Sequence, residues 1–260
     1  MIHRVLSGLM KLSLVWYETG RLLQPCRRTG LQRSPRGNRH IPPSCFAIMI
    51  MTIRICFIRH GETDWNAEKR IQGQTDIPLN ETGRSQALAM AFNAAHHDFS
   101  AIYSSDLSRA FDTAQMLAAR RGLEVKKLPQ LRERHFGIFQ GITADEGMRR
   151  YPEAYAHYKA RDPDYDFDTG ESLLRFSERV TAATDELTRY HGGQTIAAVC
   201  HAGVLDIVYR KSTGRPLHAP RDFRIPNCAL NWFRFDGQGW HLEAWDDHHH
   251  LSRVLMESAE

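Results

Sequence analysis

Two histidines stand at matching points of the chain, each directly after a stretch of apolar residues. Arg59-His60 follows the apolar run Ile53–Ile58, and His201 follows the apolar run Thr195–Cys200. Runs of this kind are typical of strands buried on both faces of a parallel sheet. Ligands of open α/β sheets bind beyond the carboxyl ends of the strands. We therefore expect the two imidazoles to face one another across one site.

Arg109 extends this predicted site by one cation. It stands in the first turn of the helix predicted after the short strand Ala101–Ser104, with Ser105 or Asp106 as a plausible N-cap. The dipole of a helix favours anions near its first turn. Taken singly, a histidine after a strand or an arginine on a helix is more often structural. Their combination with Arg59 instead predicts a pocket for an anionic ligand.

The elements that must position these residues alternate along the chain. Apolar residues at helical spacing predict helices near residues 87–95, 110–118, 173–190 and 202–212, and a last strand pair flanks Asp236–Gly239. Alternating strands and helices predict an α/β fold, a three-layer α/β/α sandwich whose mainly parallel sheet has antiparallel edge pairing.

The first 50 residues differ from the rest in charge. They hold eight Lys or Arg and one acid, which is a net charge of +7. Because the whole chain has a net charge of +4, residues 51–260 carry a net charge of −3. We expect 1–50 to be a basic leader, either disordered or a mis-assigned start before Met51, and 51–260 to form the folded domain that carries the site. An Arg-rich, acid-poor leader is also typical of organelle targeting. The basic character of the chain is therefore no argument for a nucleic-acid partner.

Partners and compartment are constrained by what the sequence lacks. No apolar run is long enough to cross a bilayer, so we expect no membrane partner. Five cysteines without CxxC spacing favour a reducing, cytoplasmic location. The histidines of 96–97 and 248–250 have no spaced acidic or Cys ligands nearby, so we interpret them as surface residues and expect no metal. The oligomeric state is not predicted.

Several motifs, in order, resemble the phosphoglycerate mutase-like histidine phosphatase superfamily. The matching segments are Arg59–Asn66, Arg70–Gly73, Ser104–Ala110, Leu131–Gly137 with Gln140-Gly141, Gly170–Leu173, Val199–Gly203 and His250-Leu251. Any one tripeptide is weak evidence, whereas the ordered set over about residues 53–251 is very specific.

The resemblance implies a role for each matching residue. His60 would be the nucleophile that becomes phosphohistidine, and Glu133 the general acid and base. Arg59, Arg109 and His201 would stabilise charge on the phosphoryl group. The remaining substrate-binding positions implied are Asn66, Gln72, Gly73, Arg134, Ala202 and Gly203. Two arginines supply the positive charge, so we expect neither a metal nor another cofactor.

The family contains both phosphatases and cofactor-dependent mutases. Mutases place a lysine shortly after Gln140-Gly141, where this chain has Thr143-Ala144, and residues 143–170, a predicted cap over the site, are rich in acids. An acidic cap would grip a second phosphate poorly. We therefore favour a phosphomonoester hydrolase acting on small phosphorylated metabolites. The alternatives are a 2,3-bisphosphoglycerate-dependent phosphoglycerate mutase and a catalytically silent phosphate-binding protein, which would normally have lost Arg59, His60 or Glu133.

Overall fold

The computed structural model describes residues 52–252. The leader predicted for residues 1–50 lies outside them. Strands and helices alternate through most of this length, as the apolar patterns predict. The elements are β1 (Ile53–Arg59), α1 (Asp64–Ala67), α2 (Glu81–Ala94), β2 (Ala101–Ser104), α3 (Ser108–Arg121), β3 (Val125–Lys127), α4 (Ala144–Arg150), α5 (Pro152–Ala160), α6 (Leu173–Tyr190), β4 (Thr195–Cys200), α7 (Ala202–Thr213), β5 (Leu230–Phe235) and β6 (Trp240–Asp247), with 3₁₀ turns at Pro129–Leu131, Gly137–Phe139 and His249–Leu251.

Six strands form one sheet in the order β3-β2-β4-β1-β5-β6. The first four are parallel to one another, while β5 runs antiparallel to both β1 and β6. The two apolar strands β1 and β4 are direct neighbours, and Arg59 pairs in register with Cys200. The predicted α/β sandwich with antiparallel pairing at one edge is confirmed.

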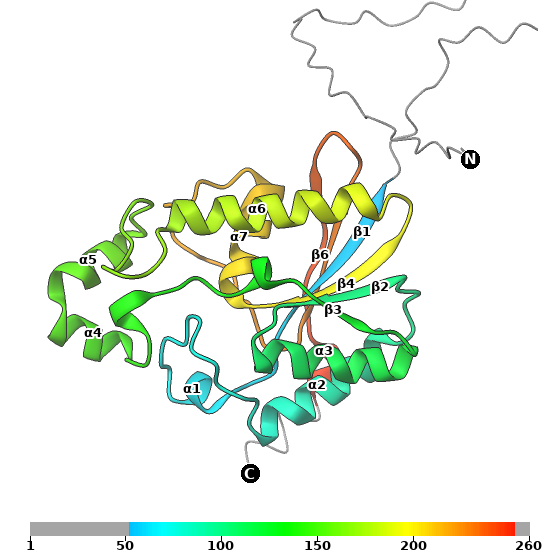
Figure 1. Ribbon diagram of the computed structural model, residues 1–260, viewed down its shortest axis with the longest axis horizontal. Coiled ribbons are helices and arrows are strands. Elements are labelled where there is room, and N and C mark those ends of the chain that lie inside the picture. The colour runs from blue at the N-terminus through cyan, green and yellow to red at the C-terminus, as the bar shows by residue number, and fades with distance from the viewer. Residues whose placement is uncertain (1–51, 253–260) are drawn as a thin grey trace, which may run out of the picture. The chain divides into compact units, whose positions relative to one another are not determined.

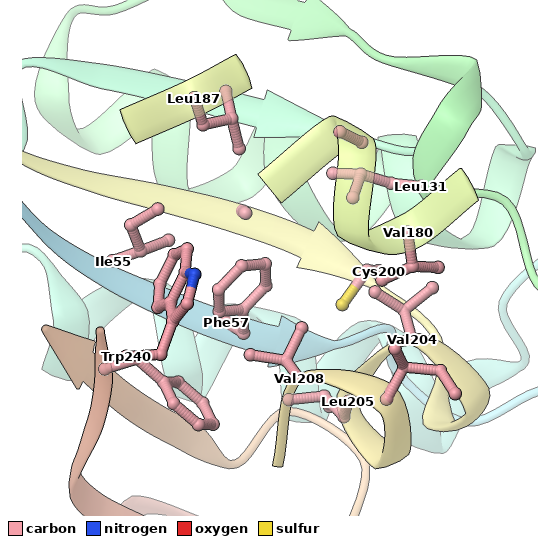
Figure 2. Packing of buried hydrophobic residues seen from close by; sticks show 14 of the residues in the cluster. Ile55, Phe57, Leu131, Val180, Leu187, Cys200, Val204, Leu205, Val208 and Trp240 are labelled. Carbon is pink, nitrogen blue, oxygen red and sulfur yellow. The ribbon is translucent and has the colours of Figure 1, made fainter. Parts of the chain in front are cut away.

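Helices cover both faces of the sheet and enclose two apolar cores. Helices α6 and α7 lie over one face and α2 and α3 over the other (Figure 1). In the first core Phe57 and Cys200 of the sheet meet Val180 of α6 and Val204 of α7 (Figure 2). Because β1 and β4 are buried on both faces, their carboxyl ends are held firmly where the histidines follow.

Residues 143–170 form α4 and α5, which lie beyond the carboxyl ends of β1 and β4 (Figure 1). This cap has a small core of its own around Phe139, Ile142, Ala154 and Phe167. Its two helices were not predicted as elements, because nine or fewer residues give too little periodicity to identify a helix. Between residues 52 and 252, no helix is both long and apolar enough to span a membrane.

Two local predictions were wrong. Helix α3 has Leu107 at its N-cap, and the carboxylate of Asp76 accepts from the backbone and hydroxyl of Ser108 instead. Asp106 is occupied by an ion pair with Arg132. On α2 the apolar residues at helical spacing within 87–95 were expected to face the core, but Leu88 and Phe92 are 48% and 50% exposed, and the buried stripe is Gly83, Gln86, Ala87, Met90, Ala91 and Ala94.

Candidate active site

The two histidines lie side by side at the ends of β1 and β4. Their ring centroids are 5.1 Å apart, and the backbone N–H of His60 donates to the carbonyl of Cys200 at 3.0 Å. Both side chains are buried. The parallel pairing of two neighbouring strands therefore produces the convergence that the sequence predicts.

Hydrogen bonding fixes which nitrogen of His60 carries a proton. Its Nδ1 lies 2.7 Å from the carbonyl oxygen of Gly61, which can only accept, so Nδ1 carries the hydrogen and Nε2 keeps its lone pair. Burial and then the charges of Arg109 and Arg59 hold the pKa of His60 well below its usual range. The imidazole is thus neutral at physiological pH, with Nε2 in the nucleophilic form.

His201 is held by a serine hydroxyl. Its Nε2 lies 2.9 Å from Ser105 Oγ, and its buried Nδ1 has no partner among residues 52–252. Burial, followed by the charges of Arg109 and other neighbours, lowers the pKa of His201 as well. A hydroxyl donating to Nε2 would leave a hydrogen on Nδ1.

These buried neutral histidines predict a dependence of stability on pH. Histidine in an unfolded chain has a pKa of about 6.5. Below this pH, His60 and His201 bind protons in the unfolded chain but stay unprotonated in the folded chain. We expect the free energy of unfolding to be constant for this pair above pH ~6.5. It should fall by up to about 1.4 kcal/mol per pH unit for each histidine below that pH. Urea titrations at pH 7.5, 6.5 and 5.5 measure the effect.

The matched comparison is His60→Asn, which removes one of the two titrating rings. Its stability should decline less steeply between pH 6.5 and 5.5 than that of the unsubstituted chain. Equal slopes would show that His60 is protonated in the folded protein, contrary to its environment.

Arg59 and Arg109 bring two positive charges to the histidines. Arg59 donates to the carbonyl of Ile225 at 2.7 Å, and Arg109 donates to the carbonyls of Thr75 and Gly73 at 2.9 and 2.8 Å. Burial lowers the pKa of each guanidinium to about 10, so both stay charged at neutral pH. Since their partners are neutral carbonyls, the two charges remain available to an anionic ligand.

Glu133 lies against the first turn of α7. Its carboxylate accepts from the backbone N–H groups of Arg134 at 2.8 Å and Gly203 at 2.9 Å. A side chain on Gly203 would collide with this carboxylate, which explains the glycine. Glu133 therefore already occupies the backbone N–H of Gly203, and the role of Gly203 in substrate binding stays a prediction.

The other predicted binding residues all line the same cavity, but they differ in their hydrogen-bond partners. Asn66 accepts from Thr63 in a capping box at α1, so its oxygen serves the backbone. Gln72 has a buried Oε1 that finds no partner within the described part of the chain. Gly73 holds Arg109 through its carbonyl, and Ala202 begins α7.

Arg134 has a largely structural position. Its guanidinium donates to the carbonyls of Glu171 and Tyr165 at 2.7 and 2.9 Å, and lies over the ring of Phe167. It thereby fastens the cap to the wall of the cavity. Two of the three guanidinium nitrogens of Arg134 are therefore already engaged, and its binding of substrate stays a prediction.

The cavity between the strand ends and the cap has a volume of about 550 Å³. Lys159 and Arg161 of the cap line it, whereas none of the seven cap acids does. Two of those acids form ion pairs elsewhere, Glu146 with Arg70 and Asp162 with His157. The expectation of an acidic cap that would grip a second phosphate poorly is therefore wrong, because the cap residues that line the cavity include Lys159 and Arg161 and none of the acids.

Supporting residues were missed in the sequence. Asn227 donates to the carbonyl of His60 at 2.7 Å, and the N–H of Cys228 donates to the carbonyl of Arg59. His250, interpreted as a surface histidine, is half-buried and bonds the carbonyl of Cys228 at 3.0 Å. Only its match to the closing His-Leu motif signalled this role. Between residues 52 and 252, no three His, Cys, Asp or Glu side chains are arranged to hold a metal ion.

Comparisons with known proteins agree with this geometry. Residues 55–248 match the histidine phosphatase superfamily (branch 1). The chain is 42% identical to phosphoglycerate mutase-like protein 4 of Arabidopsis thaliana over 77% of this chain and 87% of that one. It is 38% identical to the metal-independent phosphoserine phosphatase of the same plant, over 77% and 84%.

A solved structure adds a likeness in three dimensions. A histidine-to-alanine variant of a phosphoserine phosphatase from Entamoeba histolytica, in complex with phosphoserine, superposes with a TM-score of 0.70. It is 28% identical, over 76% of this chain and 99% of that one. The chain is a member of the histidine phosphatase superfamily and a phosphoric monoester hydrolase.

Proposed function

We propose that this chain hydrolyses small phosphorylated metabolites through a phosphohistidine formed on His60. The observation that carries the proposal is the environment of that imidazole. It is neutral, its Nδ1 hydrogen is held by the carbonyl of Gly61, and beside it lie two arginines that have no carboxylate partner among residues 52–252. A phosphate monoester carries about −1.5 to −2 charges at neutral pH, which these two guanidinium groups match.

The residues divide the reaction into two displacements. His60 Nε2 attacks phosphorus, the ester P–O bond breaks, and Glu133 gives its proton to the departing alkoxide. Water then attacks the phosphohistidine while the Glu133 carboxylate takes its proton, and the P–N bond breaks to release inorganic phosphate. Arg59, Arg109 and His201 balance charge on the equatorial oxygens throughout.

A small-molecule substrate is supported by the size of the cavity, which is typical of metabolite sites. The name of the plant phosphoserine phosphatase points the same way. The proposal needs no nucleic acid and no membrane. A cytoplasmic location is part of the proposal and is consistent with the unpaired, buried thiols of Cys56, Cys200 and Cys228.

Hydrolysis should persist after metals are removed. Arg59 and Arg109 supply the positive charge in this scheme, and a plant relative is named metal-independent. We expect release of phosphate from p-nitrophenyl phosphate and from a panel of phosphorylated metabolites to change less than about twofold in EDTA. An equal sample restored with Mg²⁺ or Mn²⁺ serves as the control. Loss of activity in the chelator and its recovery with metal would refute the mechanism.

A mutase is the second candidate, favoured by the positively charged cavity and by the name of the other plant relative. Such an enzyme would interconvert 3- and 2-phosphoglycerate in the presence of 2,3-bisphosphoglycerate. A rate no higher than background, beside measurable release of phosphate, would exclude this candidate.

A further inference from the structure

The carbonyl of Gly61 decides which nitrogen of His60 can attack phosphorus. It accepts from His60 Nδ1 at 2.7 Å and so leaves Nε2 unprotonated. A hydrogen bond weakens steeply as its geometry departs from linear, so the carbonyl must keep pointing at Nδ1. Whatever fixes the direction of this carbonyl therefore also fixes the nucleophilic form of His60.

The Gly61 carbonyl belongs to the peptide group that joins Gly61 to Glu62. A peptide group is planar, so its carbonyl and its N–H turn together and point in opposite directions. The N–H of this group, that of Glu62, donates to the side-chain oxygen Oε1 of Gln86 at 2.9 Å. Gln86 on α2 thus holds one end of the planar unit whose other end holds His60.

The preceding peptide group, between His60 and Gly61, is fixed at both of its ends. The N–H of Gly61 donates to Thr113 Oγ1 on α3 at 3.0 Å, and the carbonyl of His60 accepts from Asn227 at 2.7 Å. The hydroxyl of Thr113 in turn donates to a carbonyl of α3 at 2.7 Å. These contacts fix the chain up to Gly61, and the contact of Gln86 fixes the peptide group that follows.

Gln86 reaches this peptide group because the start of α2 touches the loop after β1. A side chain on Gly61 would collide with the carbonyl of Gly83, and a side chain on Gly83 would collide with the carbonyl of Glu62. That carbonyl also accepts from the N–H of Asn80, the N-cap of α2, at 3.0 Å. Gln86 follows one turn later on the buried stripe of α2 and is 4% exposed. A buried amide in this position needs a hydrogen-bond partner, and Glu62 N–H provides one.

We propose that Gln86 is a positioning residue for the nucleophile. By accepting from the N–H of Glu62 it holds the Gly61 carbonyl on Nδ1 of His60 and keeps Nε2 in the attacking form. Hydrogen bonds in a chain polarise one another, so this contact also strengthens the bond from the same peptide group to His60. The proposal rests on the phosphohistidine mechanism proposed above and adds to it a residue outside the cavity lining.

Gln86→Met keeps the length of the side chain and removes the acceptor. The peptide group can then turn, and His60 distributes its hydrogen between Nδ1 and Nε2. We expect kcat/KM for p-nitrophenyl phosphate to fall by about tenfold, the size of effect typical of one buried hydrogen bond. The Kd of inorganic phosphate should change less than about twofold, because Arg59 and Arg109 keep their contacts. Gln86→Glu restores an acceptor of the same length and should recover kcat/KM to within about threefold.

The tautomer of His60 is a readout that a loss of stability alone would not change. In the full chain labelled with ¹⁵N at histidine, the resonances of the His60 ring are those absent from His60→Ala. The unsubstituted chain should show a protonated Nδ1 and an unprotonated Nε2 at His60. In Gln86→Met the two nitrogens should shift toward one another, and in Gln86→Glu they should return. Gln86→Asn, whose amide is one methylene shorter, is a second test variant and should behave as Gln86→Met does.

Two controls separate this role from packing. Met90→Val removes packing in the core of the same helix without removing an acceptor, and Gln115→Met makes the same chemical change on the exposed side of α3. Both should keep kcat/KM within about twofold and leave the His60 tautomer unchanged, while urea titrations report the stability of every variant. The proposal is overturned if Gln86→Met keeps the rate and the tautomer, or if Met90→Val shifts the tautomer equally.

Failure of the proposed function would look different. Hydrolysis that survives His60→Ala would remove the phosphohistidine at this position, whichever tautomer the ring holds. Hydrolysis that depends on His60, together with an unchanged rate and tautomer in Gln86→Met, overturns only the role of Gln86.

Discussion

Replacing His60 with alanine should lower kcat/KM for phosphomonoesters by at least about 10⁴-fold. The ring is the only group that the mechanism places to attack phosphorus, and its Nε2 is in the neutral, unprotonated form. Arg59 and Arg109 would still bind the phosphate, so binding of inorganic phosphate should persist in the variant. Steady-state release of phosphate and calorimetric binding measure the two effects separately.

The matched control is His96→Ala, since His96 is exposed and distant in sequence from the site motifs. Its activity should be unchanged. A brief reaction with ³²P-labelled substrate should leave acid-labile label on the unsubstituted chain and none on His60→Ala. Label retained by the variant would assign the nucleophile to another residue.

Glu133→Gln should lower kcat/KM more for substrates with a basic leaving group than for substrates with an acidic one. General acid catalysis is worth about 10²- to 10⁴-fold, so kcat/KM for an alkyl phosphate should fall by that amount. p-Nitrophenolate leaves without a proton, and its ester should lose less than about tenfold. Because kcat/KM reports steps up to the first irreversible one, it isolates formation of the phosphohistidine.

Glutamine keeps the size of the side chain and one oxygen to accept from Gly203 or Arg134, so the fold should survive. Glu178→Gln, an exposed carboxylate on α6, is the control and should leave both substrates unaffected. An equal loss for the alkyl and aryl esters would remove Glu133 as the acid and leave it a structural ligand of α7.

The centre of the site could be predicted from the sequence because its residues follow strongly marked elements. Runs of apolar residues identified β1 and β4, and parallel pairing then brings His60 and His201 together. Contacts across long sequence separations gave no such signal. Asn227, which holds the carbonyl of His60, stands 167 positions away in a loop without periodicity.

The charge of the cap was misjudged for a related reason. Counting acids and bases in residues 143–170 says nothing about which side of a short helix each one occupies. Lys159 and Arg161 line the cavity, whereas Glu146 and Asp162 do not: Glu146 caps α4 and Asp162 accepts from the backbone N–H of Asp164. The direction of a side chain depends on how α5 packs on Phe139 and Phe167, which composition does not reveal.

The separate core of the cap has a consequence for how this enzyme can change. Phe139 and Phe167 belong to an apolar cluster that stabilises α4 and α5 and contains no residue of the sheet. The catalytic residues are instead held by β1, β4 and the elements next to them. Substitutions at Lys159 or elsewhere on the cap rim can thus alter selectivity while the nucleophile keeps its setting. A library restricted to the rim should yield new substrate preferences at little cost in folding, which makes this chain a practical scaffold for directed evolution.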